Sequence, residues 1–340
     1  MTKKILQLLF LFFYIINFSQ SYIPIDTADR PKRDVFVKNF EFENESFIKN
    51  IKEQYSGKEG REIRKIYEEF GKDFIKEIKE GKFIFKDDII KKVQEIIQNL
   101  KQNNVIIPTN IKLLISKDGS LNAFCLADGT FVINLGLYYW LENEDQMAGI
   151  IAHELAHRIL NHSLKAIENQ VRLENSKGFL QKVEDIKSQK FNKSTTAFSI
   201  FKKIFYENGI KSRKAEYEAD SLGYLLLKNT KYNKSEFVNA LSLSAKYDTI
   251  KPKGLTKEIY AKTFNFPKLP FNEKWMDMED FSSYNYNLYK EKLDKDSIST
   301  HPEMVERITR LKRIFPELNA KFKTAEADEN YKKFQKNSGI

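Results

Sequence analysis

Three of the chain's four histidines lie within ten residues, in the apolar segment that runs from Gly149 to His162. Two of them, His153 and His157, are four residues apart, and Glu154 directly follows the first. Residues four apart lie on the same face of an α-helix, so both imidazoles point to one place. A tetrahedral Zn²⁺ ion binds such nitrogens at about 2.0–2.1 Å. Because buried polar groups without partners are costly, the spacing predicts a metal site.

Glu154 is rotated from His153 by about 100° around the helix axis, which places its carboxylate beside the metal rather than on it. Zinc lowers the pKa of a bound water to about 7 and polarises a carbonyl group. Glu154 is therefore predicted to act as the general base that takes the water proton and then passes it to the leaving amine. The predicted reaction is hydrolysis of peptide bonds by a zinc-activated water.

The third zinc ligand must come from elsewhere in the chain. His162 does not fit the metzincin pattern, which has a glycine seven residues and a third histidine ten residues after the first histidine. Those positions are Leu160 and Ser163 here. We interpret His162 as a helix-end histidine near the site. Cys125 is the only cysteine, which excludes a thiolate-rich zinc site and any disulfide within the chain.

A second pair of candidate ligands lies in the segment EYEAD. Glu216 and Asp220 are four residues apart and share a helix face. One can bind zinc while the other accepts the free N–H of a ligating histidine. The spacing does not say which does which, and a merely solvated acidic face is the competing interpretation. Glu218, between them, is expected to point to the other side.

The elements around these residues can be predicted in part. Two apolar runs joined by Asp128-Gly129 predict a β-hairpin over Leu121 to Leu135, with a two-residue turn that needs positive φ at both positions. Asn143, with Gln146 three residues later, predicts the start of the helix that carries the histidines. Thr300 likewise predicts the start of a late helix.

Four segments in this order resemble the zinc metallopeptidases of family forty-eight, which include the CAAX-prenyl endopeptidases and the HtpX-, Oma- and BepA-type proteases. The segments are NAFCLADGTFVINLGL, HELAHRILNH, SRKAEYEAD and THPEMVERI. The likeness covers about residues 105 to 313. It implies a gluzincin-type metallopeptidase core.

The resemblance also implies roles for individual residues. Glu216 would be the third zinc ligand and Asp220 its supporting partner. Asn122 and His301 would help to bind the transition-state oxyanion, with Arg307 near them. A neutral imidazole at 301, in the first turn of the late helix, can still donate one hydrogen bond.

The hairpin has a possible role in substrate binding. If Asn122 to Cys125 form an exposed edge strand beside the metal, a substrate peptide can add to it as a further strand. The stretch from Ser163 to Ser212 is polar and cannot span a membrane, unlike the helices of integral-membrane relatives. This favours the soluble, exported branch of the family.

Composition restricts the partners. The formal net charge is +10, but lysine and glutamate alternate along most of the chain, and no basic stripe interleaved with aromatics indicates nucleic-acid binding. A weak, peripheral attraction to anionic lipid headgroups stays open. The N-terminus has basic residues, a 14-residue apolar run from Ile5 to Phe18 and small residues after it, a pattern typical of a secretory signal peptide. An uncleaved membrane anchor is the alternative.

Together these patterns predict a mostly α-helical α+β protein with a small sheet beside the metal helix. We expect a signal peptide (1–21), a helical N-terminal region (22–104), a zinc metallopeptidase domain (105–313) and a charged helical tail (314–340). The expected function is that of an exported, periplasmic or extracellular, metalloendopeptidase with one Zn²⁺ per chain that acts on polypeptides. The family resemblance suggests misfolded envelope proteins as these substrates. The alternative is an envelope chaperone or assembly factor whose protease site is latent.

Overall fold

The computed structural model describes residues 29–85, 87–188, 193–248 and 303–320, together with 262, 265 and 270–272. Most of the described chain is helical, with one small mixed sheet, as the sequence predicts. The predicted signal segment and the tail beyond residue 320 lie outside the described residues. Within the described part, no helix combines the length and apolar character needed to cross a bilayer.

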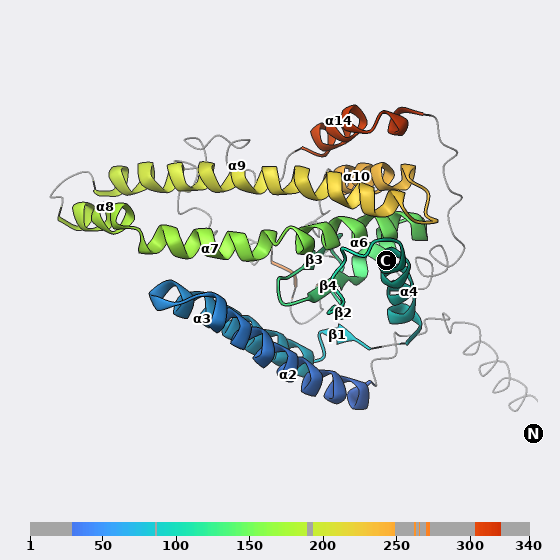
Figure 1. Cartoon of the computed structure of the whole chain (residues 1–340), viewed down its shortest axis with the longest axis horizontal. Coiled ribbons are helices and arrows are strands. Elements are labelled where there is room, and N and C mark those ends of the chain that lie inside the picture. The colour runs from blue at the N-terminus through green and yellow to red at the C-terminus, as the bar shows by residue number, and fades with distance from the viewer. Residues whose placement is uncertain are drawn as a thin grey trace, which may run out of the picture.

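Two long helices form an antiparallel hairpin at the N-terminal side, α2 (Arg30–Gln54) and α3 (Gly57–Lys79). Apolar side chains of this hairpin pack against α7 (His162–Asn175), where Ile51 and Tyr67 meet Val171. The Tyr55 hydroxyl also donates to Glu168 on α7. The predicted helical N-terminal region is therefore attached to the helix that follows the metal-binding segment (Figure 1). The predicted boundary at residue 104 stays a prediction.

The sheet has four strands in the order β1-β2-β4-β3. Strand β2 pairs parallel to β4, whereas β1 and β3 pair antiparallel to their neighbours, so β3 lies at an edge. Alternate residues face opposite sides: Leu113 and Ile115 pack toward α4 and α6, and Leu114 packs toward α2 and α3. The bounds are β1 (Phe83–Ile84), α4 (Asp87–Asn103), β2 (Lys112–Ser116), β3 (Ala123–Cys125) and β4 (Thr130–Asn134).

The predicted hairpin is β3–β4, but its predicted turn is wrong. Of the two predicted turn residues, only Gly129 has a positive φ, +87°. Its N–H donates to the carbonyl of Leu126, so the loop is longer than two residues. The backbone bonds between Leu126 and Thr130 close a loop of three residues, which needs a positive φ only at its last position, here Gly129. The Asp128 carboxylate accepts hydrogen bonds from the Thr130 N–H at 3.0 Å and from Lys112 Nζ at 2.8 Å, a buried ion pair that the turn sequence alone does not reveal.

Helix α6 (Glu144–Ile159) carries the histidines and packs beside β3, after the short α5 (Leu135–Trp140). Asn143 caps it as predicted, since its side chain accepts from the Gln146 N–H at 2.9 Å. The Gln146 side chain accepts from the Glu142 N–H rather than from Asn143. Residues on most sides of α6 are buried, as its apolar sequence predicts.

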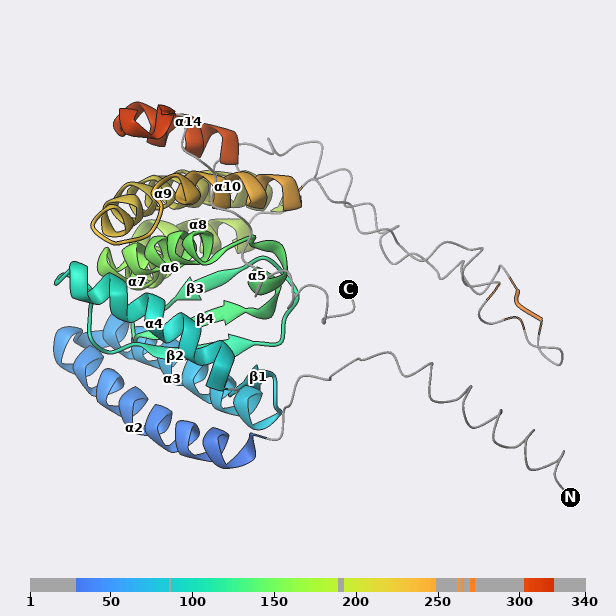
Figure 2. The ribbon, with the colours of Figure 1, turned by 90° about the vertical axis from the view of Figure 1, so that its right-hand side faces the viewer.

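The remaining helices form layers on the far side of α6 from the N-terminal hairpin (Figure 2). Helices α9 and α10 both pack on α6, and α14 lies on the other side of α9 and α10. The late helix begins at Met304 with Glu303 as its N-cap, so the predicted start at Thr300 is too early. The backbone angles of Glu303, φ −54° and ψ 134°, are not helical and keep this residue out of the helix. The bounds are α8 (Lys177–Ser188), α9 (Lys193–Lys228), α10 (Ser235–Asp248), α14 (Met304–Ile314) and a 3-10 helix (Pro316–Asn319).

Candidate metal centre

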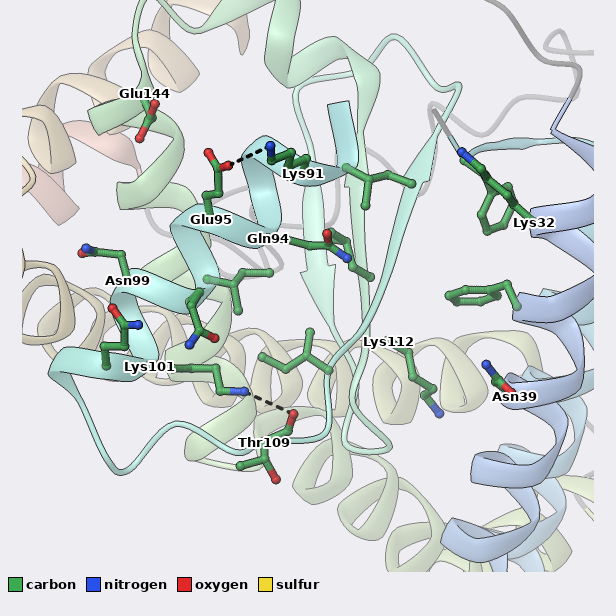
Figure 3. Close-up of a pocket in the computed structure, with 18 of the residues that line it drawn as sticks. Lys32, Asn39, Lys91, Gln94, Glu95, Asn99, Lys101, Thr109, Lys112 and Glu144 are labelled. Carbon is green, nitrogen blue, oxygen red and sulfur yellow. Dashed lines mark hydrogen bonds and ion pairs between the residues drawn. The ribbon is translucent and has the colours of Figure 1, made fainter. Parts of the chain in front are cut away.

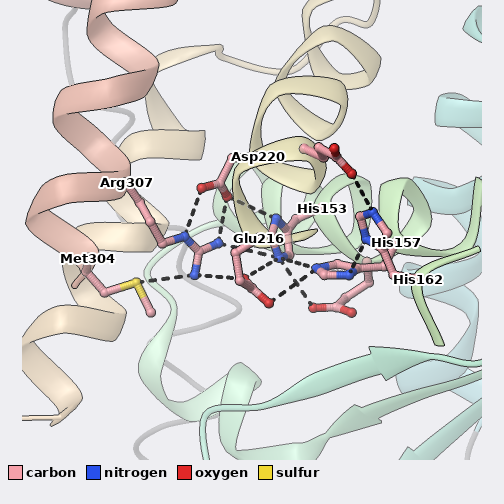
Figure 4. Close-up of polar contacts among 9 residues, drawn as sticks. His153, His157, His162, Glu216, Asp220, Met304 and Arg307 are labelled. Atoms are coloured by element: carbon pink, nitrogen blue, oxygen red, sulfur yellow. Dashed lines mark hydrogen bonds and ion pairs between the residues drawn. The ribbon is translucent and has the colours of Figure 1, made fainter. Parts of the chain in front are cut away.

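Three side chains from two helices converge on one point. His153 and His157 come from α6 and Glu216 comes from α9, and one ligand atom of each lies within 4.8 Å of the others. The two Nε2 atoms are 3.1 Å apart, and they lie 3.5 and 3.6 Å from the Glu216 carboxylate oxygens (Figure 4). Such a set of two imidazole nitrogens and one carboxylate is found in catalytic zinc sites, which leave a fourth position open. The donor set therefore fits zinc.

A glycine lets the two helices approach closely enough to form this cluster. Gly223 lies one and two turns after Asp220 and Glu216, on the face of α9 that meets α6. A Cβ at 223 would lie only 2.8 Å from the His153 Cα and 3.0 Å from its backbone N. A Cβ is not found so close to other atoms, so a larger residue here would force the helices apart. The close packing at Gly223 thus positions Glu216 against the histidines.

Asp220 and Arg307 form a buried pair behind His153. The Nδ1 of His153 is 3.1 Å from the Asp220 carboxylate. Arg307, from α14, donates to both oxygens of Asp220, at 2.8 and 2.6 Å, and its Nη1 lies 3.1 Å from Glu216. A carboxylate that accepts the free N–H of a ligating histidine fixes the orientation of that ring. Asp220 is therefore in position to support His153, and Arg307 holds both acidic residues (Figure 4).

The two histidines are in opposite electrostatic environments. Burial by itself lowers the pKa of His153, but its contacts with Asp220 and Glu216 outweigh burial and raise that pKa to about 10. Burial, together with the charge of His153, lowers the pKa of His157 to about 3. Burial also raises the pKa of Asp220, but Arg307 and His153 outweigh it and keep that pKa below its usual value. Of the two rings, His153 is therefore the one that more readily gains a second proton when no metal is bound, and His157 the one that stays neutral.

A cavity of about 500 Å³ opens beside the cluster. Glu154 lines it, with its side chain only 15% exposed and its carboxylate 4.0 Å from the His153 Nε2. The edge strand β3 lines the same cavity along its whole length. The apolar part of the lining also comes from several helices, with Leu137, Ile150, Leu241, Tyr247 and Met304. The geometry therefore places the Glu154 carboxylate and the edge strand β3 next to the candidate metal ligands.

Of the other predicted site residues, the structure describes Asn122 and Arg307 but not His301. Asn122 is exposed, directly precedes β3 and lines the cavity. Arg307 also lines the cavity, but its guanidinium is bound to Asp220 and Glu216, which the sequence did not reveal. His301 lies outside the described residues, so its predicted role stays a prediction.

Two residues have contacts that the sequence prediction missed. His162 begins α7 instead of ending α6, and its Nδ1 lies 3.0 Å from the Nδ1 of His157. Glu218 was expected to point away, but its carboxylate lies 3.1 Å from the His162 Nε2. The only signal for this contact was the third histidine at the end of the metal-binding segment.

A larger cavity, of about 860 Å³, lies between α2 and α4. Its lining mixes lysine, glutamate, amide and apolar side chains, and it contains none of the cluster residues (Figure 3). Three of its lysines have polar partners: Lys91 lies near Glu95, Lys101 donates to the Thr109 carbonyl and Lys112 is paired with Asp128. Among the described residues, only His153, His157 and Glu216 form a group that could hold a metal ion, so this cavity offers no comparable set of ligands.

Comparisons with known proteins agree with this geometry. The sequence profile of Peptidase family M48 matches residues 87–315. The chain is 24% identical over 107 residues to the putative beta-barrel assembly-enhancing protease of Vibrio cholerae serotype O1, which covers 30% of this chain and 22% of that protein. It is 32% identical over 71 residues to the beta-barrel assembly-enhancing protease of Yersinia pestis and 36% over 70 residues to that of Escherichia coli K12. Each of these two matches covers 21% of this chain and 14% of the relative, so the chain spans less than a quarter of the length of these relatives.

Proposed function

Because the chain belongs to Peptidase family M48, a family of zinc metallopeptidases, we propose that it is a zinc-dependent endopeptidase that hydrolyses peptide bonds of protein substrates. The observation that supports this most strongly is the convergence of His153, His157 and Glu216 beside a cavity lined by Glu154. A purely structural zinc site closes all four positions with protein ligands. Among the described residues, the cluster offers three.

Five polar residues that line the cavity have a role in this proposal. His153, His157 and Glu216 would hold the zinc ion, which would supply a Lewis acid that polarises a carbonyl group and acidifies water. Glu154 accepts the proton that the attacking water loses as its oxygen bonds to the carbonyl carbon. The same carboxyl then delivers the proton to the amine nitrogen as the C–N bond breaks. Asn122, which lines the cavity, is proposed to donate a hydrogen bond to the oxygen of the reacting carbonyl.

Strand β3 is the proposed binding site for the substrate backbone. It pairs with β4 on one side only, and its other edge lies along the cavity. An extended peptide can add to such an edge through main-chain hydrogen bonds, which gives affinity with little dependence on side chains. This supports polypeptides of varied sequence as the substrates.

We further propose that the substrates are envelope proteins and that the chain acts outside the cytoplasm. The names of the relatives from Vibrio, Yersinia and Escherichia join beta-barrel assembly with proteolysis. The N-terminal segment has the composition of a signal peptide. Those names also keep open the second candidate, an assembly factor whose protease site is latent.

The test compares the full chain with Glu154→Gln. The wild type should carry about one zinc per chain by elemental analysis and degrade casein, and the variant should keep the zinc but lose degradation by several orders of magnitude. Zinc-free wild-type protein, or an equally active variant, would refute the proposal. In cells, an intact envelope phenotype with Glu154→Gln would favour the assembly factor over the protease.

A further inference from the structure

The two nitrogens of His157 face different surroundings. Its Nε2 points toward the cluster, 3.1 Å from the His153 Nε2 and 3.6 Å from Glu216. Its Nδ1 points the other way, 3.0 Å from the Nδ1 of His162, and the two rings meet at 76° with centroids 4.9 Å apart (Figure 4). Two nitrogens at this distance share one proton in a hydrogen bond. The question is which ring carries it.

The contact between Glu218 and His162 indicates which of the two rings carries this proton. The other ring nitrogen of His162, Nε2, lies 3.1 Å from the Glu218 carboxylate. An ionised carboxylate only accepts hydrogen bonds, so the His162 Nε2 carries a proton. In a neutral ring the His162 Nδ1 then has none and accepts. The proton between the rings therefore belongs to the Nδ1 of His157, which leaves the lone pair of its Nε2 free to bind a metal.

The backbone places His162 for this contact. Helix α6 ends at Ile159, and Asn161 takes a left-handed conformation, with φ 55° and ψ 37°, before α7 begins at His162. This tight turn brings the His162 ring back over His157. The His162 side chain is only 10% exposed, and Glu218 reaches it from α9, where Lys214 lies 3.6 Å from the second carboxylate oxygen. The contact thus joins three helices.

We propose that His162 and Glu218 form a positioning pair that holds His157 in the orientation and tautomer required for zinc binding. This inference rests on the proposed function, because it assigns the zinc ion to the cluster. The pair is the counterpart of Asp220, which lies against the Nδ1 of His153. Helix α9 then supplies one ligand, Glu216, and a support for each histidine ligand. Partners of this kind typically change metal affinity by roughly 10- to 100-fold when they are removed.

The first test observes the tautomers directly. The chain has four histidines, so ¹⁵N-histidine NMR of the full chain can resolve each ring. In the metal-free wild type we expect the Nε2–H tautomer for His162, and in the zinc-loaded protein the Nδ1–H tautomer for His157. A zinc-loaded protein in which His157 binds through Nδ1, or in which the His162 Nε2 carries no proton, would overturn the proposal.

The second test measures zinc affinity by competition with a chromogenic chelator. His162→Phe keeps a ring but removes both nitrogens, and should weaken zinc binding by roughly 10- to 100-fold. His162→Asn should lose less, because its amide oxygen can stand near the place of Nδ1 and accept from His157. The matched control is Glu184→Gln on α8, an exposed acid 68% accessible, which should bind zinc like the wild type.

Several results separate this proposal from simple packing and from the proposed function. A His162→Phe protein whose zinc affinity is within about twofold of wild type overturns the pair. Melting temperatures with and without zinc show whether the loss is in zinc binding or in the fold alone; an equal fall in both states also overturns it. If His162→Phe does not fold, Glu218→Gln and the wild-type tautomers decide. If the wild-type chain has the expected tautomers and binds zinc but does not cleave casein, the proposed protease function is refuted, whereas the His162–Glu218 positioning pair is supported.

Discussion

Gly223→Ala tests whether close helix packing forms the metal centre. The added Cβ would lie 2.8 Å from the His153 Cα, and the atoms around it are backbone, which cannot rotate away. Ordinary carbon contacts are about 3.5–4.0 Å, so α9 must move from α6 by about 0.7–1.2 Å. Overpacking of this kind costs about 1–3 kcal/mol, while alanine in place of a helical glycine returns roughly 0.5–1 kcal/mol. The expected net effect on the free energy of unfolding is therefore a loss of about 0–2.5 kcal/mol.

The effect on zinc binding should be larger than the effect on stability. Glu216 lies on the same face of α9, seven residues before Gly223, so a shift of the helix moves its carboxylate relative to both histidines. Metal sites tolerate changes of only about 0.2 Å in ligand distance. We expect zinc affinity to fall at least about tenfold, measured by chelator competition, with melting curves recorded with and without zinc.

Gly178→Ala provides the matched control. Gly178 lies in α8 and has no atom within 4 Å of the place where a Cβ would stand. Alanine there should leave zinc binding unchanged and change the free energy of unfolding by no more than about 1 kcal/mol, in the stabilising direction. If Gly223→Ala binds zinc as tightly as Gly178→Ala, the close approach of α9 to α6 does not position the ligand.

Three further predictions follow from the same site. Arg307→Met leaves the buried carboxylates of Asp220 and Glu216 without their cation and should lower the free energy of unfolding by about 3–5 kcal/mol in urea titrations; a loss below 1 kcal/mol would contradict the buried ion pairs. Because the pKa of His153 is raised to about 10 in the metal-free chain, zinc must displace one proton from this ring at neutral pH. Zinc affinity should therefore rise about tenfold per pH unit between pH 7.5 and 9, and a flat profile there would contradict the raised pKa. Burial raises the pKa of the Cys125 thiol, so Ellman's reagent at pH 8 should label it only after denaturation, and rapid labelling of the native chain would place it at the surface.

Local regularities made part of this structure predictable. The pairs His153 and His157, and Glu216 and Asp220, share helix faces because a helix repeats every 3.6 residues whatever packs around it. The cap at Asn143 was predictable for the same reason, since the partner of its side chain lies three residues away. The hairpin was predictable from its apolar runs, but its turn was not, because Asp128-Gly129 fits both a two-residue and a three-residue loop, and the register of the paired strands decides which one forms.

The sequence by itself determined which side chains could bind a metal and which of them lie together on each helix. Only the tertiary structure decided that Glu216 meets the histidines while Asp220 stands behind His153, because that choice depends on where α9 crosses α6, at Gly223. It also decided that Arg307 holds both carboxylates and that Glu218 reaches His162. The physical reason is range: hydrogen bonds within a helix fix neighbours three or four residues apart, whereas contacts between helices depend on the packing of the whole core.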